Sequence, residues 1–105
     1  MKNFTVVICT YKRHFLIPHC LENILNNLLL PDKIIIVDQN YDFVTYNKIT
    51  NLFKNRNFKN YIIIRNLIQK GLTKSKNISL KNIKTKYVFF IDDDIILEKR
   101  YFKKD

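Results

Sequence analysis

The sequence predicts an α/β protein with a mostly parallel sheet, arranged as a three-layer α/β/α sandwich. Three observations lead to this prediction. Short, unbroken runs of β-branched and aromatic residues alternate along the chain with stretches of helical periodicity. The apolar runs contain few polar residues, which is typical of strands that are buried on both faces. A helix between consecutive strands implies right-handed crossovers, and these keep neighbouring strands parallel.

The elements are expected in the order β-α-β-α-β-α-β. The first helix is predicted over 16–29, where leucine and isoleucine recur at helical spacing until Pro31 ends it. A second helix is predicted over 43–54, and a third follows Gly71, with Ser79 on the side nearest the sheet. The predicted strands are the apolar runs at residues 4–9, 33–38, 61–66 and 86–92.

Length and composition indicate one domain over residues 1–105, since 47% hydrophobic content supports a packed core. No segment reaches the ~18 apolar residues of a membrane span. The apolar run at 4–9 is too short for a signal peptide, so we expect a cytoplasmic protein. The formal net charge of +10 predicts anionic partners. Peripheral association with the inner face of the membrane is a further expectation.

Three of the nine acidic residues stand side by side at Asp92, Asp93 and Asp94, directly after a predicted strand. At ~6 Å, each pair of carboxylates costs on the order of 0.7 kcal/mol even in bulk water. A bound divalent cation converts this repulsion into attraction, and Mg²⁺ or Mn²⁺ takes carboxylates together with substrate phosphates. The triplet therefore indicates metal or nucleotide binding, with a solvated turn and an Asp helix cap as the alternative.

Polar and charged residues also follow the other predicted strands. In a doubly wound sheet the ligand binds outside the carboxyl ends of the strands. No Gly-rich loop follows the first strand, which excludes a dinucleotide fingerprint and a Walker A phosphate cradle. The segments at these ends are "TYKRH" (10–14), "DQN" (38–40), "QKGLTKSKN" (69–77) and "DDD" (92–94).

Four blocks of the sequence together resemble the N-terminal, nucleotide-sugar-binding half of family 2 glycosyltransferases with the GT-A fold. The blocks are "FTVVICTYKRHFLIPHCLENILNN", "KIIIVDQN", "QKGLTKSKNISL" and "KYVFFIDDDIIL", in the family's order and spacing. The resemblance implies a nucleotide-diphosphate sugar donor, with a UDP-sugar as the first expectation, and Mn²⁺ or Mg²⁺ as cofactor. It also implies transfer with inversion to a hydroxyl of a glycan, lipid or protein acceptor.

The resemblance assigns nucleotide-binding roles to five residues. Thr10 and Tyr11 match the family's Thr-Tyr-x-Arg signature and line the base pocket, and Arg13 lies near it. Asp38 corresponds to the acidic residue that hydrogen-bonds the base. Lys76 replaces an arginine that lies close to the nucleotide, and a lysine keeps the charge but loses the bidentate fork.

The aspartate triplet matches the family's DxD motif. Asp92 and Asp94 fit its outer positions and are the predicted metal ligands, whereas Asp93 is expected to reach the ribose or the donor. No motif places a general base. We therefore expect the N-terminal portion of a longer domain, which ends just after the motif and binds donor without transferring sugar. An incomplete sheet edge also predicts self-association.

Two other functions stay open at this point. A Mg²⁺-dependent phosphohydrolase of the haloacid dehalogenase type also has a DxD after an apolar strand, but normally after the first strand. A non-catalytic basic module that binds RNA or anionic membrane explains the charge of +10. It does not explain the triplet, which repels phosphates when no metal is bound.

Overall fold

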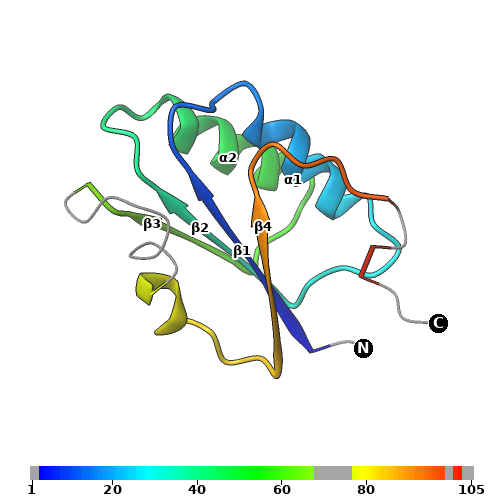
Figure 1. Cartoon of the computed structure of the whole chain (residues 1–105). Helices are drawn as coiled ribbons and strands as arrows, with labels where there is room; N and C mark the ends of the chain where they lie inside the picture. The colour runs from blue at the N-terminus through cyan, green and yellow to red at the C-terminus, as the bar shows by residue number, and fades with distance from the viewer. Residues whose placement is uncertain (1–2, 68–76, 99–100, 103–105) are drawn as a thin grey trace.

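The computed structural model describes residues 3–67, 77–98 and 101–102. The strands within these residues form one parallel sheet in the order β3-β2-β1-β4 (Figure 1). This is the predicted α/β class with the predicted parallel sheet. The elements are β1 (Phe4–Thr10), α1 (Ile17–Leu25), β2 (Lys33–Asp38), α2 (Val44–Asn55), β3 (Tyr61–Arg65) and β4 (Tyr87–Asp92).

The strand register brings the polar strand ends to one edge of the sheet. Thr10 of β1 stands opposite Asp38 of β2, and Asp38 stands opposite Arg65 of β3. On the other side of β1, Cys9 is paired with Asp92 of β4. Residues more than 80 positions apart in the sequence therefore meet at the carboxyl ends of the two central strands and their neighbours.

Helices α1 and α2 lie together on one face of the sheet (Figure 1). The core beneath them forms because alternate residues of each strand point to this face and meet the apolar stripes of the helices. Aromatic rings close its lower end, where the centroids of Phe4 and Phe102 are 4.8 Å apart. The fully buried members include Phe4, Val6, Ile8, Ile17, Leu21, Ile24, Ile34, Ile36, Ile49 and Phe53.

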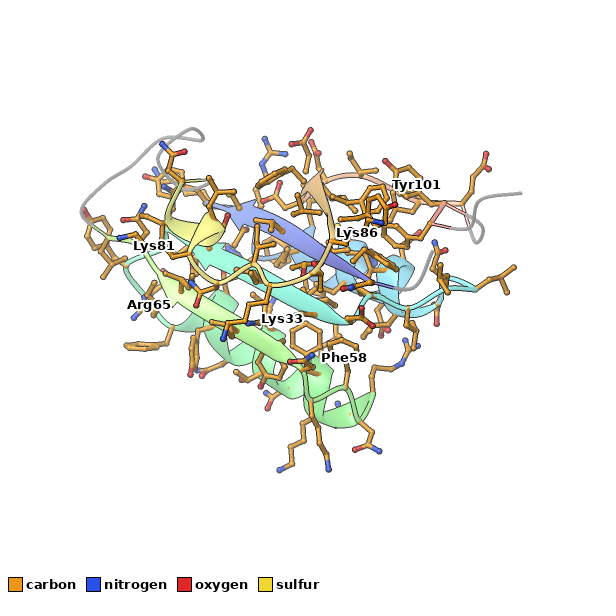
Figure 2. All side chains as sticks on the ribbon, turned by 90° about the horizontal axis from the view of Figure 1, so that it is seen from below. Lys33, Phe58, Arg65, Lys81, Lys86 and Tyr101 are labelled. Carbon is orange, nitrogen blue, oxygen red and sulfur yellow. The ribbon has the colours of Figure 1, made fainter. Side chains whose placement is uncertain are left out.

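The segment that leads into β4 crosses the opposite face of the sheet, as Figure 2 shows for the chain around Lys81. The Thr5 and Thr85 hydroxyl oxygens are 2.6 Å apart, and the Lys33 ammonium donates to the Asn82 carbonyl at 3.2 Å. Ser79 is fully buried there, as expected for a small residue close to the sheet. The predicted third helix is described only at residues 77–80, which are helical; the rest of it lies outside the described residues.

Two details of the sequence prediction were wrong. The first helix ends at Leu25 instead of residue 29, because the Asn27 N–H bonds to the Ile24 carbonyl oxygen, only three residues back, and the Asn27 side chain donates to the Glu98 carbonyl oxygen at 2.7 Å. Burial on both faces holds for the central strands β1 and β2, whereas the outer strands β3 and β4 are largely half-buried or exposed. No helix in the described part of the chain is long and apolar enough to cross a membrane.

Candidate functional site

A cavity of about 420 Å³ opens at the carboxyl ends of β1, β2 and β4. It unites most of the residues that the sequence singled out, because the parallel register stacks these strand ends side by side. Asp38 is absent from its lining, and Lys76 lies outside the described residues. The lining residues are Cys9, Thr10, Tyr11, Arg13, Gln39, Asp92, Asp93 and Asp94.

The three aspartates of the triplet differ in exposure. Asp92 and Asp94 are exposed, whereas Asp93 is only 7% exposed. Helix α1 holds the chain just after the triplet, since the Leu97 N–H donates to the Asn23 side-chain oxygen at 3.2 Å. All three aspartates line the cavity, with Asp92 and Asp94 open to solvent and Asp93 buried.

The burial of Asp93 changes its acidity. Burial raises the pKa of its carboxyl group above the ordinary value, and the neighbouring Asp94 charge adds to this. The Thr10 hydroxyl and the Arg13 guanidinium act in the opposite direction. The Thr10 hydroxyl group lies close enough to Asp93 to favour its charged form, although it makes no hydrogen bond of good geometry. Burial thus disfavours the charged form of Asp93, and the Arg13 guanidinium offsets part of this cost.

Cys20 of α1 packs directly beneath the triplet. Its thiol is 1% exposed and donates to the Asp92 carbonyl oxygen at 3.5 Å. Burial, followed by the charges of the three aspartates, raises the pKa of Cys20 to about 12. The thiol therefore stays neutral and packs under the triplet as a small core residue. A nucleophilic role would require a thiolate, which this environment disfavours.

Arg13 lies between two carboxylates of the triplet. Its Nη1 is 2.8 Å from Oδ2 of Asp94, and its Nε is 3.7 Å from Oδ1 of Asp93. The Arg13 backbone is fixed because its carbonyl oxygen accepts hydrogen bonds from Leu16 and Ile17, where α1 begins. Among the described residues, it is the basic side chain that pairs with the triplet.

Asp38 links two of the loops around the cavity through hydrogen bonds. It is fully buried, and its Oδ1 accepts hydrogen bonds from the Asn40 backbone at 3.0 Å and the Asn40 amide group at 2.7 Å. Asn40 in turn accepts from the Lys12 N–H at 2.7 Å. This bond holds Lys12 at φ 55°, in the left-handed region that is uncommon for residues other than glycine. The loops after β1 and β2 are thus joined through one buried carboxylate.

Arg65, at the end of β3, was not singled out by the sequence. Its Nε is 3.6 Å from Oδ2 of Asp38, and its guanidinium stacks 4.1 Å from the centre of the Phe43 ring. One Arg65 nitrogen also donates to three carbonyl oxygens of the loop after β2, those of Asn40, Tyr41 and Asp42. The sequence signal for Arg65 was a basic residue near the end of the apolar run at 61–66, which follows in the chain the run that ends in Asp38.

Gln39 is a second site residue that the sequence prediction missed. Its side chain lines the cavity and is 8% exposed, and its Nε2 has no hydrogen-bond partner in the described structure. Buried polar groups are nearly always hydrogen-bonded, and an unmet one costs roughly 1–3 kcal/mol. An unpaired amide donor at a cavity wall is therefore a feature that a polar ligand can satisfy. The sequence signal for Gln39 was its place in the "DQN" segment that follows the second predicted strand.

The triplet offers a limited number of metal ligands. In the part of the chain that the structure describes, no three Asp, Glu, His or Cys side chains converge on one point. Mg²⁺ is commonly held by one or two carboxylates together with substrate phosphates and water. The open carboxylates of Asp92 and Asp94 fit such an ion, which would complete its coordination with ligand oxygens.

These features together define a class of protein: an α/β domain with an acidic ligand cavity at the carboxyl ends of a parallel sheet. The family model described as glycosyl transferase family 2 matches residues 5–104. The chain belongs to this family.

Solved structures of similar fold agree with this assignment. A mannosyltransferase from Pyrobaculum calidifontis, in complex with GDP-Man and Mn²⁺, superposes with a TM-score of 0.84 at 19% identity over 93% of this chain. TarS residues 1–349 from S. aureus, in complex with UDP-GlcNAc, gives 0.80 at 22% identity over 96% of this chain. The chain spans only 29% of either structure. The fold is thus the GT-A fold; no curated protein sequence matches the chain.

Proposed function

We propose that this chain is the donor-binding part of a glycosyltransferase that uses a nucleotide-diphosphate sugar and transfers the sugar to an acceptor hydroxyl with inversion. The observation that carries the proposal is the cavity in which the "TYKR" loop, Gln39 and the aspartate triplet face one another. The family membership supports the same reaction class. The position of the triplet argues against the phosphohydrolase alternative. In that class the DxD motif normally follows the first strand, whereas here it follows β4, at the edge of the described sheet.

Asp92 and Asp94 are the proposed ligands of a divalent cation, Mn²⁺ or Mg²⁺. Both carboxylates are exposed to the cavity, so they can be reached by an ion that also contacts the donor. When bound, such an ion neutralises the negative charge that develops on the leaving diphosphate. The mannosyltransferase structure with GDP-Man and Mn²⁺ supports this choice of cofactor.

The nucleoside is proposed to lie against the ends of β1 and β2. Tyr11 is 40% exposed at the cavity and offers an aromatic face, while Thr10 and Gln39 offer polar groups. Asp38 is fully buried in this structure, so its proposed contact with the base requires the ligand to reach its Oδ2, which has no hydrogen-bond partner among the described residues. Asp93 is proposed to reach the ribose or the donor, and Lys76 to lie near the nucleotide.

Several finer points of the proposal depend on the family alone. The structural neighbours hold GDP-Man and UDP-GlcNAc, and we propose a UDP-sugar for this chain, with a glycan, lipid or protein acceptor. We also propose a cytoplasmic location, with peripheral association at the inner face of the membrane, to which the net charge of +10 is suited. Donor binding without transfer by these 105 residues, and self-association through a sheet edge, stay predictions.

Calorimetry with UDP tests the proposal. The chain is titrated with UDP in the presence of Mn²⁺ and again in EDTA, and binding is expected only with Mn²⁺. Asp94→Asn should abolish this binding, whereas Asp32→Asn, outside the cavity, should leave it unchanged. Equal UDP binding in both buffers would contradict the metal role. Salt-sensitive RNA binding that ignores divalent ions would instead favour the basic-module alternative.

A further inference from the structure

The Arg13 guanidinium lies against two of the three carboxylates that line the cavity. It is 2.8 Å from Asp94 Oδ2 and 3.7 Å from Asp93 Oδ1, so it bridges the two carboxylates. One of these, Asp94, is a proposed metal ligand. In this structure the mutual repulsion of the triplet is therefore offset by a positive charge that belongs to the chain itself.

A divalent cation and Arg13 need the same carboxylate. Mg²⁺ binds oxygen ligands at about 2.0–2.1 Å, whereas the guanidinium already donates to Asp94 Oδ2 at hydrogen-bond distance. Arg13 contacts only Oδ2 of Asp94, but a cation on the other carboxylate oxygen would lie within a few ångströms of the guanidinium, and the two positive charges would repel each other. We therefore expect metal binding at Asp94 to weaken the contact between Arg13 and Asp94.

We propose that Arg13 is an internal counter-ion that holds the triplet before the donor arrives and moves to the donor diphosphate when the metal binds. This inference rests on the proposed function. The planar guanidinium can donate two parallel hydrogen bonds to phosphate oxygens, so it is suited to both positions. Arg13 is then a positioning residue that exchanges its partner in step with metal binding.

The surroundings of Arg13 allow this exchange. Its side chain is 44% exposed and that of Asp94 is 46% exposed, and exposed ion pairs are weak and easily broken. The backbone of Arg13 stays fixed through its carbonyl hydrogen bonds to Leu16 and Ile17. Only the side chain has to move, and both of its positions lie at the same cavity.

The exchange predicts effects of opposite sign for one substitution. Arg13→Gln removes the competitor of the metal, so Mn²⁺ alone should bind about threefold to tenfold more tightly, in line with the loss of a nearby like charge. The same variant loses a charged phosphate ligand, so UDP at saturating Mn²⁺ should bind about tenfold more weakly. Arg13→Lys keeps the charge, and its Mn²⁺ affinity should stay close to that of the wild type. A residue that only stabilises the loop would weaken both ligands together.

Two titrations of the full 105-residue chain test the proposal. The first measures free Mn²⁺ by electron paramagnetic resonance without nucleotide, and the second measures UDP binding by calorimetry at saturating Mn²⁺. Arg56→Gln is the matched control, because Arg56 pairs with Glu22 between α1 and α2, away from the cavity. The control should match the wild type in both titrations.

Tighter Mn²⁺ binding by Arg13→Gln, combined with weaker UDP binding, is the expected result. Unchanged or weaker Mn²⁺ binding by Arg13→Gln would overturn the competition between the arginine and the metal. Unchanged UDP binding would overturn the move to the diphosphate. If the wild type binds Mn²⁺ but no UDP, the proposed function fails, and the first titration still decides whether Arg13 competes with the ion.

Discussion

The carboxylate of Asp38 and the guanidinium of Arg65 face each other across the ends of β2 and β3, with 3.6 Å between Oδ2 and Nε. Asp38 is fully buried, and the Arg65 side chain is 20% exposed. Neither of these two facing atoms has another hydrogen-bond partner among the described residues. Together with Asn40, the pair fixes the loop that forms one wall of the cavity.

Asp38→Asn should lower the free energy of unfolding by about 2 kcal/mol, because it leaves the partly buried Arg65 without its counter-charge. Chemical denaturation of the purified variant measures this loss. Glu22→Gln is the control, since Glu22 pairs with Arg56 at the surface, where an ion pair contributes about 0–1 kcal/mol. An equal decrease in the free energy of unfolding of the two variants would show that burial does not strengthen the ion pair of Asp38 and Arg65.

Asp38→Asn should also weaken UDP binding while Mn²⁺ binding without nucleotide stays close to the wild type. The reason is that Asp38 joins the loops after β1 and β2 but lies outside the metal-binding triplet. The two affinities are measured separately by calorimetry. A UDP affinity equal to that of the wild type would leave Asp38 with a purely structural role in the turn.

Gln39→Leu separates ligand binding from folding. The substitution removes a buried amide that lacks a partner for its Nε2, so stability should stay unchanged or rise by up to about 1 kcal/mol. UDP affinity in Mn²⁺ should fall about tenfold if the ligand accepts a hydrogen bond from this amide. Asn51→Leu, on the exposed side of α2, is the control and should leave UDP binding unaltered. Loss of stability with intact UDP binding would contradict the role of Gln39 at the site.

Cys20 should make stability depend on pH in the alkaline range. Its pKa is raised from 9.0 to about 12 in the folded chain, so its contribution is fully present below pH 9. Between pH 9 and 12 the unfolded chain loses the thiol proton first, and stability should fall by roughly 1 kcal/mol per pH unit. Denaturation curves of the wild type and Cys9→Ala should show this decline, and those of Cys20→Ala should show a shallower one. Parallel curves for all three proteins would contradict it.

The sequence predicted the α/β class, the strand positions and the acidic end of β4, because these depend on local patterns. The runs of β-branched residues mark the strands, and three adjacent aspartates after an apolar run are visible in the sequence alone. The four blocks that resemble family 2 glycosyltransferases then predicted the GT-A fold, which the family match and the solved structures confirm.

The contacts between side chains from different strand ends could not be predicted in this way. The Arg65 network depends on which strand lies beside β2, and the bridge from Arg13 to Asp94 joins residues 81 positions apart. The burial of Asp93 between two exposed aspartates depends on how the chain turns beyond β4. Such features depend on tertiary packing, which the periodicity of the sequence does not predict.

A divalent ion and a nucleoside diphosphate are proposed to meet at the triplet, and paramagnetic NMR can detect this meeting. Substoichiometric Mn²⁺ is added to the ¹⁵N-labelled chain in the presence of UDP, and the broadening of each amide signal is measured. The signals of Thr10, Tyr11 and Asp92–Asp94 are expected to broaden first, excess Mg²⁺ should restore them, and Asp94→Asn should prevent the effect. Broadening centred elsewhere, such as around Glu22 and Arg56 between α1 and α2, or an unchanged spectrum, would contradict this.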